Sequence, residues 1–404
     1  MQEPNLNFQG LGIAPQLVET LIRLKFKTAT PIQHQAIPIA LDGKDLIGIA
    51  QTGTGKTMAF AVPLIQYLAH NKGRALVLVP TRELALQVEE SVLTIASAFR
   101  IKTVALIGGD PMYRQIQKLA REPRVLIATP GRLIDLIGQR KVHLRDISIL
   151  VLDEADRMLD MGFAPQIEQI LKTVPLQRQT MLFSATMPGS IVKIAATHMK
   201  FPVQVEVAPS GTAAKGVTHE LFIVRVDRKK ELLGKLLAQY RGSVLLFCRT
   251  KIGTAKIVRV IRQMGHSAAE IHSDRSLSQR REALAGFKAG KYRVLAATDI
   301  AARGIDVVGI ELVLNYDLPD DAENYVHRIG RTGRAGMVGH AISFAAPDQR
   351  NDVLNIEKLI KSTLPISRHP DIPSENFDKP RNVFSSNKFQ ARRQRGFSRT
   401  RRYS

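Results

Sequence analysis

The chain has 404 residues, 44% of them hydrophobic, which is enough for two domains with real cores. Its 58 Lys and Arg against 36 Asp and Glu give a net charge of +22, which favours a polyanion such as nucleic acid as partner. A ribosome-associated or merely soluble basic protein is the alternative on charge alone. One cysteine, Cys248, excludes an internal disulfide and a cysteine metal cluster.

The N-terminal stretch "MQEPNLNFQG" has neither the basic patch nor the apolar segment of a signal peptide. No run approaches the ~18 apolar residues that a membrane span needs. Cys248 lies within the apolar run "VLLFC" and is expected to be a buried free thiol in a reducing compartment. We therefore expect a soluble cytoplasmic protein.

In the first half of the chain, short runs rich in Val, Ile and Leu alternate with longer helical patterns such as 83–99. Near-continuous apolar runs are typical of parallel strands buried on both faces. The expected strands are 45–50, 75–80, 103–108, 124–129, 149–154 and 180–185. The alternation predicts a doubly wound α/β domain over residues 1–207.

The small, flexible residues of 208–217 predict a linker, after which the alternation restarts. The expected strands are now 221–226, 243–248, 293–298, 311–316 and 340–345. A second α/β domain over 218–365 follows, and a cleft between two such domains is a natural ligand site. Residues 366–404 are predicted to form a disordered basic tail, because the last 24 of them hold eight Lys or Arg and no acid.

The stretch "AQTGTGKT" (50–57) follows an expected strand and precedes a helical pattern, as a phosphate-binding loop does. Gly53 and Gly55 allow backbone N–H groups to face phosphate oxygens. Lys56 would reach the β- and γ-phosphates, and Thr57 would bind Mg²⁺. The first position of the pattern is alanine rather than glycine.

Two acids, Asp153 and Glu154, stand at the carboxyl end of the expected strand 149–154. Doubly wound sheets place their sites at this edge. Asp153 can hold Mg²⁺ through water, and Glu154 can orient or deprotonate an attacking water. Loop and acids together predict a Mg²⁺-dependent nucleoside triphosphatase.

Two further stretches suggest the nucleotide and how its γ-phosphate is stabilised. In "KFKTATPIQ", Phe26 can stack on a base and the Gln33 amide can pair with adenine. In "HRIGRTGRAG", Arg331 and Arg334 are candidates for arginines that stabilise phosphoryl transfer across a cleft.

The motifs "AQTGTGKT", "PTRELA", "TPGR", "DEAD", "SAT", "ARGID" and "HRIGRTGR" stand in the order and spacing of a known family. Over Phe8 to about residue 361 the chain resembles the DEAD-box RNA helicases, most closely their bacterial RhlE-type branch. The resemblance implies two tandem RecA-like domains, ATP and Mg²⁺ as cofactors, and RNA as partner. Lys25 stands where the family usually has Gly, and Ser273 and Leu277 stand where it usually has Gly and Gln.

By position, the resemblance also implies functional sets. The nucleotide-binding set is Phe8, Phe26, Gln33, Gln51, Thr52, Gly53, Thr54, Gly55, Lys56, Thr57 and the ribose contact Asp306. The catalytic set is Lys56, Asp153, Glu154, His327, Arg331 and Arg334, with Thr57 and Asp153 as the metal-binding pair. The RNA-binding set is Arg82, Gly109, Thr129, Arg132, Arg280 and Arg303.

Ser184 and Thr186 of "SAT" are expected to bond through their hydroxyls to Asp153, Asp156 or His327. In the family this motif couples hydrolysis to duplex separation. Taken alone, the pair could equally satisfy its own backbone.

The expected function is a monomeric, RNA-stimulated ATPase that grips RNA backbone without regard to sequence and separates short duplexes or remodels RNA–protein complexes. Ribosomal precursors and the RNA-decay machinery are candidate partners. A DNA translocase or repair motor and a non-catalytic RNA clamp are the alternatives.

Overall fold

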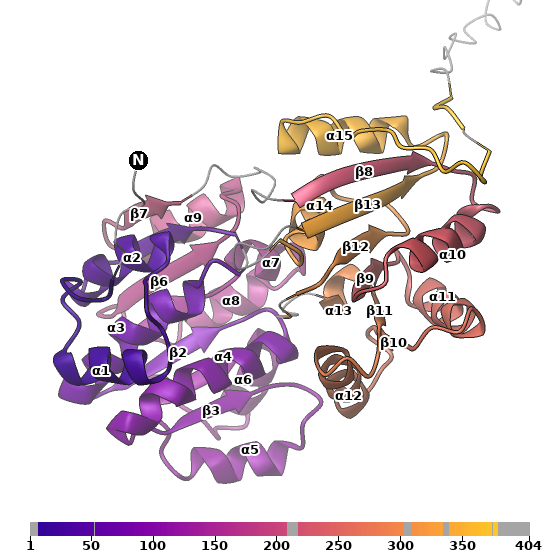
Figure 1. The fold of residues 1–404 in the computed structure, drawn as a ribbon. Coiled ribbons are helices and arrows are strands. Elements are labelled where there is room, and N and C mark those ends of the chain that lie inside the picture. The colour runs from indigo at the N-terminus through magenta and orange to yellow at the C-terminus, as the bar shows by residue number, and fades with distance from the viewer. Residues whose placement is uncertain are drawn as a thin grey trace, which may run out of the picture.

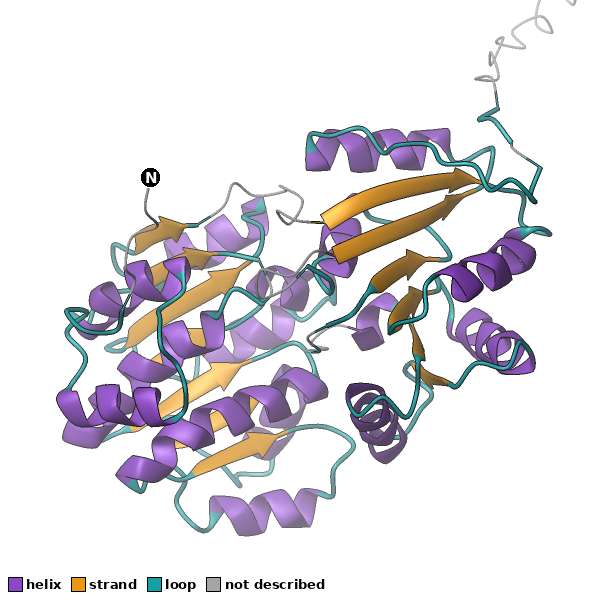
Figure 2. Cartoon of the chain, in the orientation of Figure 1, coloured by secondary structure: helices purple, strands orange, loops and turns teal. Residues whose placement is uncertain are grey.

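The computed structural model describes residues 7–51, 53–207, 217–302, 307, 309–333, 339–373 and 375–378. Within these residues the chain forms two lobes, each a parallel sheet covered by helices on both faces (Figures 1 and 2). The predicted fold class of two tandem doubly wound α/β domains is therefore confirmed. No helix in the described ranges is long and apolar enough to cross a membrane.

The first domain is built on a parallel sheet with the order β3-β4-β2-β5-β6-β1-β7. Its strands are β1 (Leu46–Ile49), β2 (Arg74–Leu78), β3 (Thr103–Leu106), β4 (Val125–Ala128), β5 (Ile147–Leu152), β6 (Gln179–Ser184) and β7 (Val203–Glu206). Its helices are α1 (Pro15–Arg23), α2 (Pro31–Leu41), α3 (Lys56–His70), α4 (Arg82–Ala96), the 3₁₀ turn η1 (Ser97–Phe99), α5 (Met112–Leu119), α6 (Pro130–Gly138), α7 (Ala155–Asp160), α8 (Ala164–Leu171) and α9 (Gly189–His198).

The second domain has a parallel sheet with the order β10-β11-β9-β12-β13-β8. Its strands are β8 (Val217–Ile223), β9 (Val244–Phe247), β10 (Ala268–Ile271), β11 (Val294–Ala297), β12 (Leu312–Asn315) and β13 (Gly339–Ala345). Its helices are α10 (Lys229–Gln239), α11 (Lys251–Gln263), α12 (Leu277–Lys288), α13 (Asp299–Ala302), α14 (Ala322–Ile329) and α15 (Arg350–Ile360).

The two sheets have a similar arrangement, and an arginine occupies the equivalent position in each. Arg124, just before β4, donates to the carbonyls of Leu68 (2.7 Å) and Gly73 (3.0 Å). Arg293, just before β11, likewise donates to the carbonyl of Leu237 (2.6 Å). Each guanidinium thus satisfies a carbonyl near the end of the helix that precedes the neighbouring strand, α3 before β2 and α10 before β9, as buried backbone requires. The strands of the two domains can therefore be compared position by position.

Two strands were not predicted from the sequence, β7 and β10. β7 reads VQVE and is mostly exposed, while β10 reads AAEI and contains residues of low strand propensity. Both exist because a neighbouring strand, β1 or β11, offers a ladder of hydrogen bonds. Their local sequences carry too little signal to predict them.

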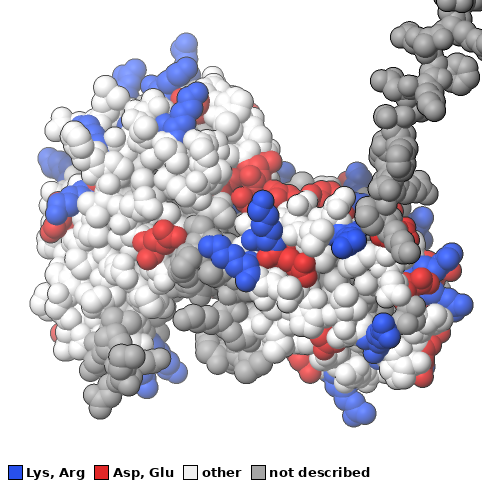
Figure 3. Space-filling model, turned by 90° about the horizontal axis from the view of Figure 1, so that it is seen from above, with Lys and Arg blue, Asp and Glu red and all other residues white. Residues whose placement is uncertain are grey.

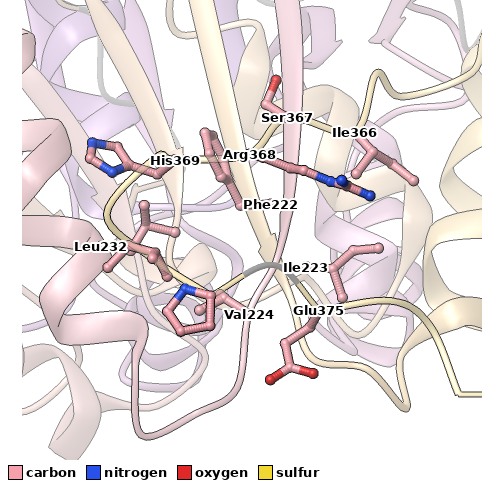
Figure 4. A pocket seen from close by; sticks show the side chains of 11 residues that line it. Phe222, Ile223, Val224, Leu232, Ile366, Ser367, Arg368, His369 and Glu375 are labelled. Carbon is pink, nitrogen blue, oxygen red and sulfur yellow. The ribbon is translucent and has the colours of Figure 1, made fainter.

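The predicted end of the second domain at residue 365 is wrong. The Leu221 N–H donates to the Pro365 carbonyl and the Ser367 N–H donates to the Leu221 carbonyl, both at 2.8 Å. Ile366 thereby pairs in parallel with edge strand β8, and Ile372 is buried in the core of the domain. Figure 4 shows this segment beside β8, where its side chains line a small pocket. The segment covers a strand edge that would otherwise be unpaired, so the domain includes residues 366–373, and Phe377 packs against its core as well. The rest of the predicted tail and 208–216 of the linker lie outside the described residues.

Candidate functional site

The carboxyl edge of the first sheet carries two adjacent groups of loops. Strands β5, β6 and β1 lie side by side in that order. β1 leads into the phosphate loop, β5 into the acids and β6 into the "SAT" motif. Strands β3, β4 and β2 form the other half of the sheet and lead to Gly109, Thr129 and Arg82. Because loops after parallel strands lie on one edge, the two groups meet where β2 pairs with β5.

The phosphate loop ends at Gly55, whose φ of +91° is a left-handed conformation that favours glycine. Helix α3 begins directly after it, so its first N–H groups face the loop. Lys56 is buried, and its Nζ donates to the Ala50 carbonyl at 2.8 Å. Thr54 Oγ1 donates to the Gln51 carbonyl at 2.7 Å, which closes the loop on itself. The predicted strand–loop–helix context is present.

Gln33 connects the candidate base site to this loop. Its Oε1 accepts the Thr30 N–H and its Nε2 donates to the Gly55 carbonyl, both at 3.0 Å. A primary amide has two N–H groups and two lone pairs, so Gln33 retains capacity for one donor and one acceptor contact to a base. Phe26 is half-buried, whereas Phe8 is only 3% exposed and packs in the first domain's core.

Asp153 and Glu154 are both buried at the end of β5. Burial raises the pKa of Asp153 to about 7, although Lys56 opposes the shift. Burial also acts to raise the pKa of Glu154, but Arg157 and Arg331 outweigh it and hold that pKa below its ordinary value. Glu154 therefore stays charged and can accept a proton, while the Asp153 carboxylate suits a compensating cation.

The residues present fit a magnesium ion held mainly by substrate. The described residues contain no group of three or more His, Cys, Asp or Glu side chains that could hold a metal. Mg²⁺ characteristically binds one or two carboxylates together with phosphates and water. Asp153, with its raised pKa, and Thr57, in the first turn of α3, would be the protein's contribution.

Arg157 is a functional candidate that the sequence analysis missed. Its guanidinium is 1% exposed, and Nη1 lies 2.9 Å from Glu154 Oε2. Glu154 itself has φ +52°, a strained conformation for a residue with a side chain. The ion pair with Arg157 thus holds the Glu154 carboxylate in one orientation. The only local signal is its position three residues after Glu154.

Ser184 and Thr186 of the "SAT" motif hydrogen-bond to Asp156, one of the three partners predicted for them. Asp156 Oδ2 accepts from Thr186 Oγ1 (3.1 Å), the Thr186 N–H (2.9 Å) and the Ala185 N–H (3.0 Å). Ser184 Oγ accepts the Asp156 N–H at 3.3 Å. Glu323, on α14 of the second domain, lies close enough to Asp156 and Thr186 for both to affect its pKa. The motif therefore connects the acids to the other domain.

The second domain contributes basic groups to the same cleft. His327 and Arg331 line it together with Arg157 of the first domain. Arg331 is 2% exposed and lies close enough to Glu154 to lower its pKa. Candidate catalytic residues that are about 180 residues apart in the chain therefore meet at one site.

Arg82, Arg132 and Gly109 gather at the other half of the sheet edge. Gly109 has φ +77°, and a Cβ there would overlap the Arg82 guanidinium. Arg132 Nη1 donates to the Asp110 carbonyl at 3.1 Å. Thr129 lies nearby at the start of α6. Four of the six predicted RNA contacts thus form one group.

Arg280 occupies a different setting from the one predicted. It forms an ion pair with Glu83 across the domains at 2.8 Å, and both side chains are largely buried. Leu277, one turn earlier on α12, joins the core cluster whose other members all belong to the first domain. In this structure Arg280 holds the domains together, and an RNA contact stays a prediction. Thr52, Arg303, Asp306 and Arg334 lie outside the described residues.

A phosphate loop, a buried acid pair and an arginine from a second similar domain define a two-domain P-loop nucleoside triphosphatase. The model of the DEAD/DEAH box helicases matches residues 30–194, and that of the helicase conserved C-terminal domain matches residues 228–336. The chain is 42% identical to the ATP-dependent rRNA helicase RRP3 of Meyerozyma guilliermondii, over 90% of this chain and 77% of that protein. It is 40% identical to the DEAD-box ATP-dependent RNA helicase CshA of Bacillus subtilis, over 91% of this chain and 70% of that protein.

Two solved structures share the fold of both domains. Dbp5 of S. cerevisiae bound to RNA and ADP BeF3 superposes with a TM-score of 0.81 at 29% identity, over 90% of this chain and 95% of that one. Mss116p bound to ssRNA and AMP-PNP gives a TM-score of 0.82 at 27% identity, over 89% and 78%. The chain belongs to the DEAD-box helicase family. Membership in the RhlE-type branch stays a prediction.

Proposed function

We propose that the chain is an ATP-dependent RNA helicase that hydrolyses ATP when RNA is bound and locally separates short duplexes. The observation that carries the proposal is the shared sheet edge, on which the nucleotide residues adjoin the Arg82–Gly109–Arg132 group. When the two domains close, they therefore contact bound ATP and bound RNA at the same time. Two ligands that prefer the same closed state bind cooperatively.

In this proposal each nucleotide-site residue has a role that follows from its position. Lys56 and the first turn of α3 hold the phosphates, and Asp153 and Thr57 would hold Mg²⁺, which would supply positive charge to neutralise the phosphates. Glu154, fixed by Arg157, orients and deprotonates the attacking water. Arg331 stabilises the charge that develops on the transferred phosphoryl group.

The RNA side of the edge is proposed to grip the backbone rather than the bases. Arginine side chains and glycine or threonine backbone groups suit phosphate and 2′-OH contacts, which carry no sequence information. Ribosomal precursor RNA is one proposed substrate, because relatives such as RRP3 are named rRNA helicases. We also propose that the protein works in the cytoplasm, where its buried Cys248 would remain a free thiol.

The first test compares activators of ATP hydrolysis. Single-stranded RNA should stimulate phosphate release strongly, whereas single-stranded DNA of the same length should not, because 2′-OH contacts are lost. Equal stimulation by both would favour a DNA motor. If a single-turnover measurement showed no ATP hydrolysis with either nucleic acid, the protein would be a non-catalytic clamp. Either of these two results would overturn the proposal.

Thr186→Val should separate hydrolysis from duplex separation. The valine keeps the shape but removes the hydroxyl that donates to Asp156, next to Glu323 of the second domain, so the link between the acids and that domain is weakened. We expect unwinding of a short duplex to fall about tenfold, a typical coupling effect, and ATP hydrolysis to fall much less. Thr197→Val on α9, whose hydroxyl bonds only within its helix, is the matched control. Equal losses of both activities in Thr186→Val would contradict the coupling role.

A further inference from the structure

The outer face of α5 carries an aromatic and basic patch that none of the roles above uses. Figure 1 places α5 at the lower edge of the first domain, outside edge strand β3. Its inner side chains Met112, Ile116 and Leu119 pack against the domain core. The exposed side chains, here called the α5 patch, are Tyr113, Arg114, Gln117, Lys118 and Arg121.

Tyr113 presents an open ring within this patch. Its side chain is 58% exposed, which is unusual for a large aromatic residue on a helix. Arg114 Nε donates to the Tyr113 hydroxyl at 3.0 Å, and its guanidinium carbon lies 5.7 Å from the ring centroid. The hydrogen bond restrains both planar groups. A restrained aromatic ring with an adjacent guanidinium is the kind of surface on which unpaired bases stack.

The patch is positively charged. Lys102 Nζ donates to the Arg121 carbonyl at 3.1 Å and brings a fourth cation to Arg114, Lys118 and Arg121. The neighbouring acids include Asp110, two residues before the helix, and Glu122, just after it. The face seen from above is different: its Lys and Arg side chains are scattered and acidic side chains gather where the lobes meet (Figure 3). The α5 patch therefore suits a polyanion better than that face does.

The patch is continuous with the group proposed to hold RNA. Arg132 donates to the Asp110 carbonyl, and Gln115 bonds to both the N–H (3.1 Å) and the carbonyl (2.9 Å) of Ile107. These bonds fix α5 to the loop that contains Gly109. Tyr113 follows Gly109 by four residues and lies in the first turn of α5. The loop that contains Gly109 therefore leads directly into the part of α5 that carries Tyr113.

We propose that the α5 patch extends the RNA track beyond the core. An unpaired base next to the gripped segment stacks on Tyr113, and Arg114, Lys118 and Arg121 contact the phosphates of the adjoining backbone. The inference rests on the proposed RNA binding and adds a site for single-stranded RNA that flanks the segment held between the domains. The patch favours substrates in which a short duplex adjoins an unpaired extension.

The test measures binding of the full chain, with a non-hydrolysable ATP analogue, to a short RNA of about 6 and a long RNA of about 12 unpaired nucleotides. Tyr113→Ala should raise the Kd for the long strand about tenfold, as the loss of one stacked base does, and that for the short strand less than twofold. Tyr113→Phe keeps the ring and loses only its hydrogen bond with Arg114, so it should weaken long-strand binding far less than Tyr113→Ala, whereas Tyr113→Leu should resemble the alanine variant. Arg114→Gln should flatten the salt dependence for the long strand only.

Tyr67→Ala serves as the matched control. Tyr67 is also exposed, but it lies near the end of α3, which runs from the carboxyl edge of the sheet to the opposite one. Equal losses for both lengths in Tyr113→Ala, or no loss for the long strand, would overturn the inference. If RNA of neither length stimulated ATP hydrolysis by the natural protein, the proposed function itself would fail, so the two failures are distinguishable.

Discussion

Glu154→Gln is expected to reduce RNA-stimulated ATP hydrolysis by about 10²–10⁴-fold, the usual contribution of a general base. The amide keeps the size of the side chain but accepts no proton, and it gives up the ion pair with Arg157. Nucleotide binding should change only a few-fold, because the phosphates are held by Lys56 and the first turn of α3. Steady-state phosphate release and titration with a fluorescent ATP analogue measure the two quantities.

Glu90→Gln provides the control for this change. Glu90 is exposed on α4, so the same carboxylate-to-amide exchange leaves the site intact. Its turnover should match that of the natural protein. Should Glu154→Gln retain turnover within tenfold, another group must activate the water. An unfolding curve for each variant checks that the loss of the Glu154–Arg157 ion pair has not disrupted the first domain.

Arg331→Ala is expected to reduce the hydrolysis rate by about 10³–10⁵-fold, the range known for arginines that stabilise phosphoryl transfer. Arg331 is buried in the cleft and close to Glu154, although it belongs to the other domain. ATP should still bind the first domain, so the defect should appear in the maximal rate rather than in the nucleotide Kd. Single-turnover hydrolysis at saturating ATP and RNA measures it.

Arg241→Ala is the matched control, because Arg241 is exposed in the loop between α10 and β9, at the amino end of the strand and so at the opposite edge of the sheet from the cleft. It should hydrolyse ATP at the natural rate. A maximal rate for Arg331→Ala close to that of the control would show that hydrolysis does not depend on the second domain. Domain closure around ATP would then not be needed for hydrolysis.

Much of the nucleotide site could be predicted because its signals are local. "AQTGTGKT" lies where a strand must turn into a helix, and "VLDEAD" ends an apolar run, so both motifs specify their position on the sheet edge. Arg157 and Glu83 could not be predicted in the same way. Their importance depends on partners, Glu154 and Arg280, that the packing of helices and domains brings within 3 Å.

Arg280 illustrates the limit of positional inference. The sequence places it among arginines that suit RNA phosphates, but the structure buries it against Glu83, which is 197 residues away in the chain. Leu277, where the family usually has Gln, packs into the first domain beside it. A buried ion pair with an apolar neighbour depends on the relative position of the domains, which no local pattern encodes.

The sequence by itself determined the two α/β domains, the phosphate loop and the acid pair, because alternating apolar runs and glycine-rich turns are short-range consequences of residue type. The tertiary structure alone decided that β7, β10 and the segment after residue 365 join the sheets, since each forms only where a strand edge offers unsatisfied hydrogen bonds. It also decided which charges pair across the cleft. Such pairs are fixed by distances in space, and spacing along the chain does not specify them.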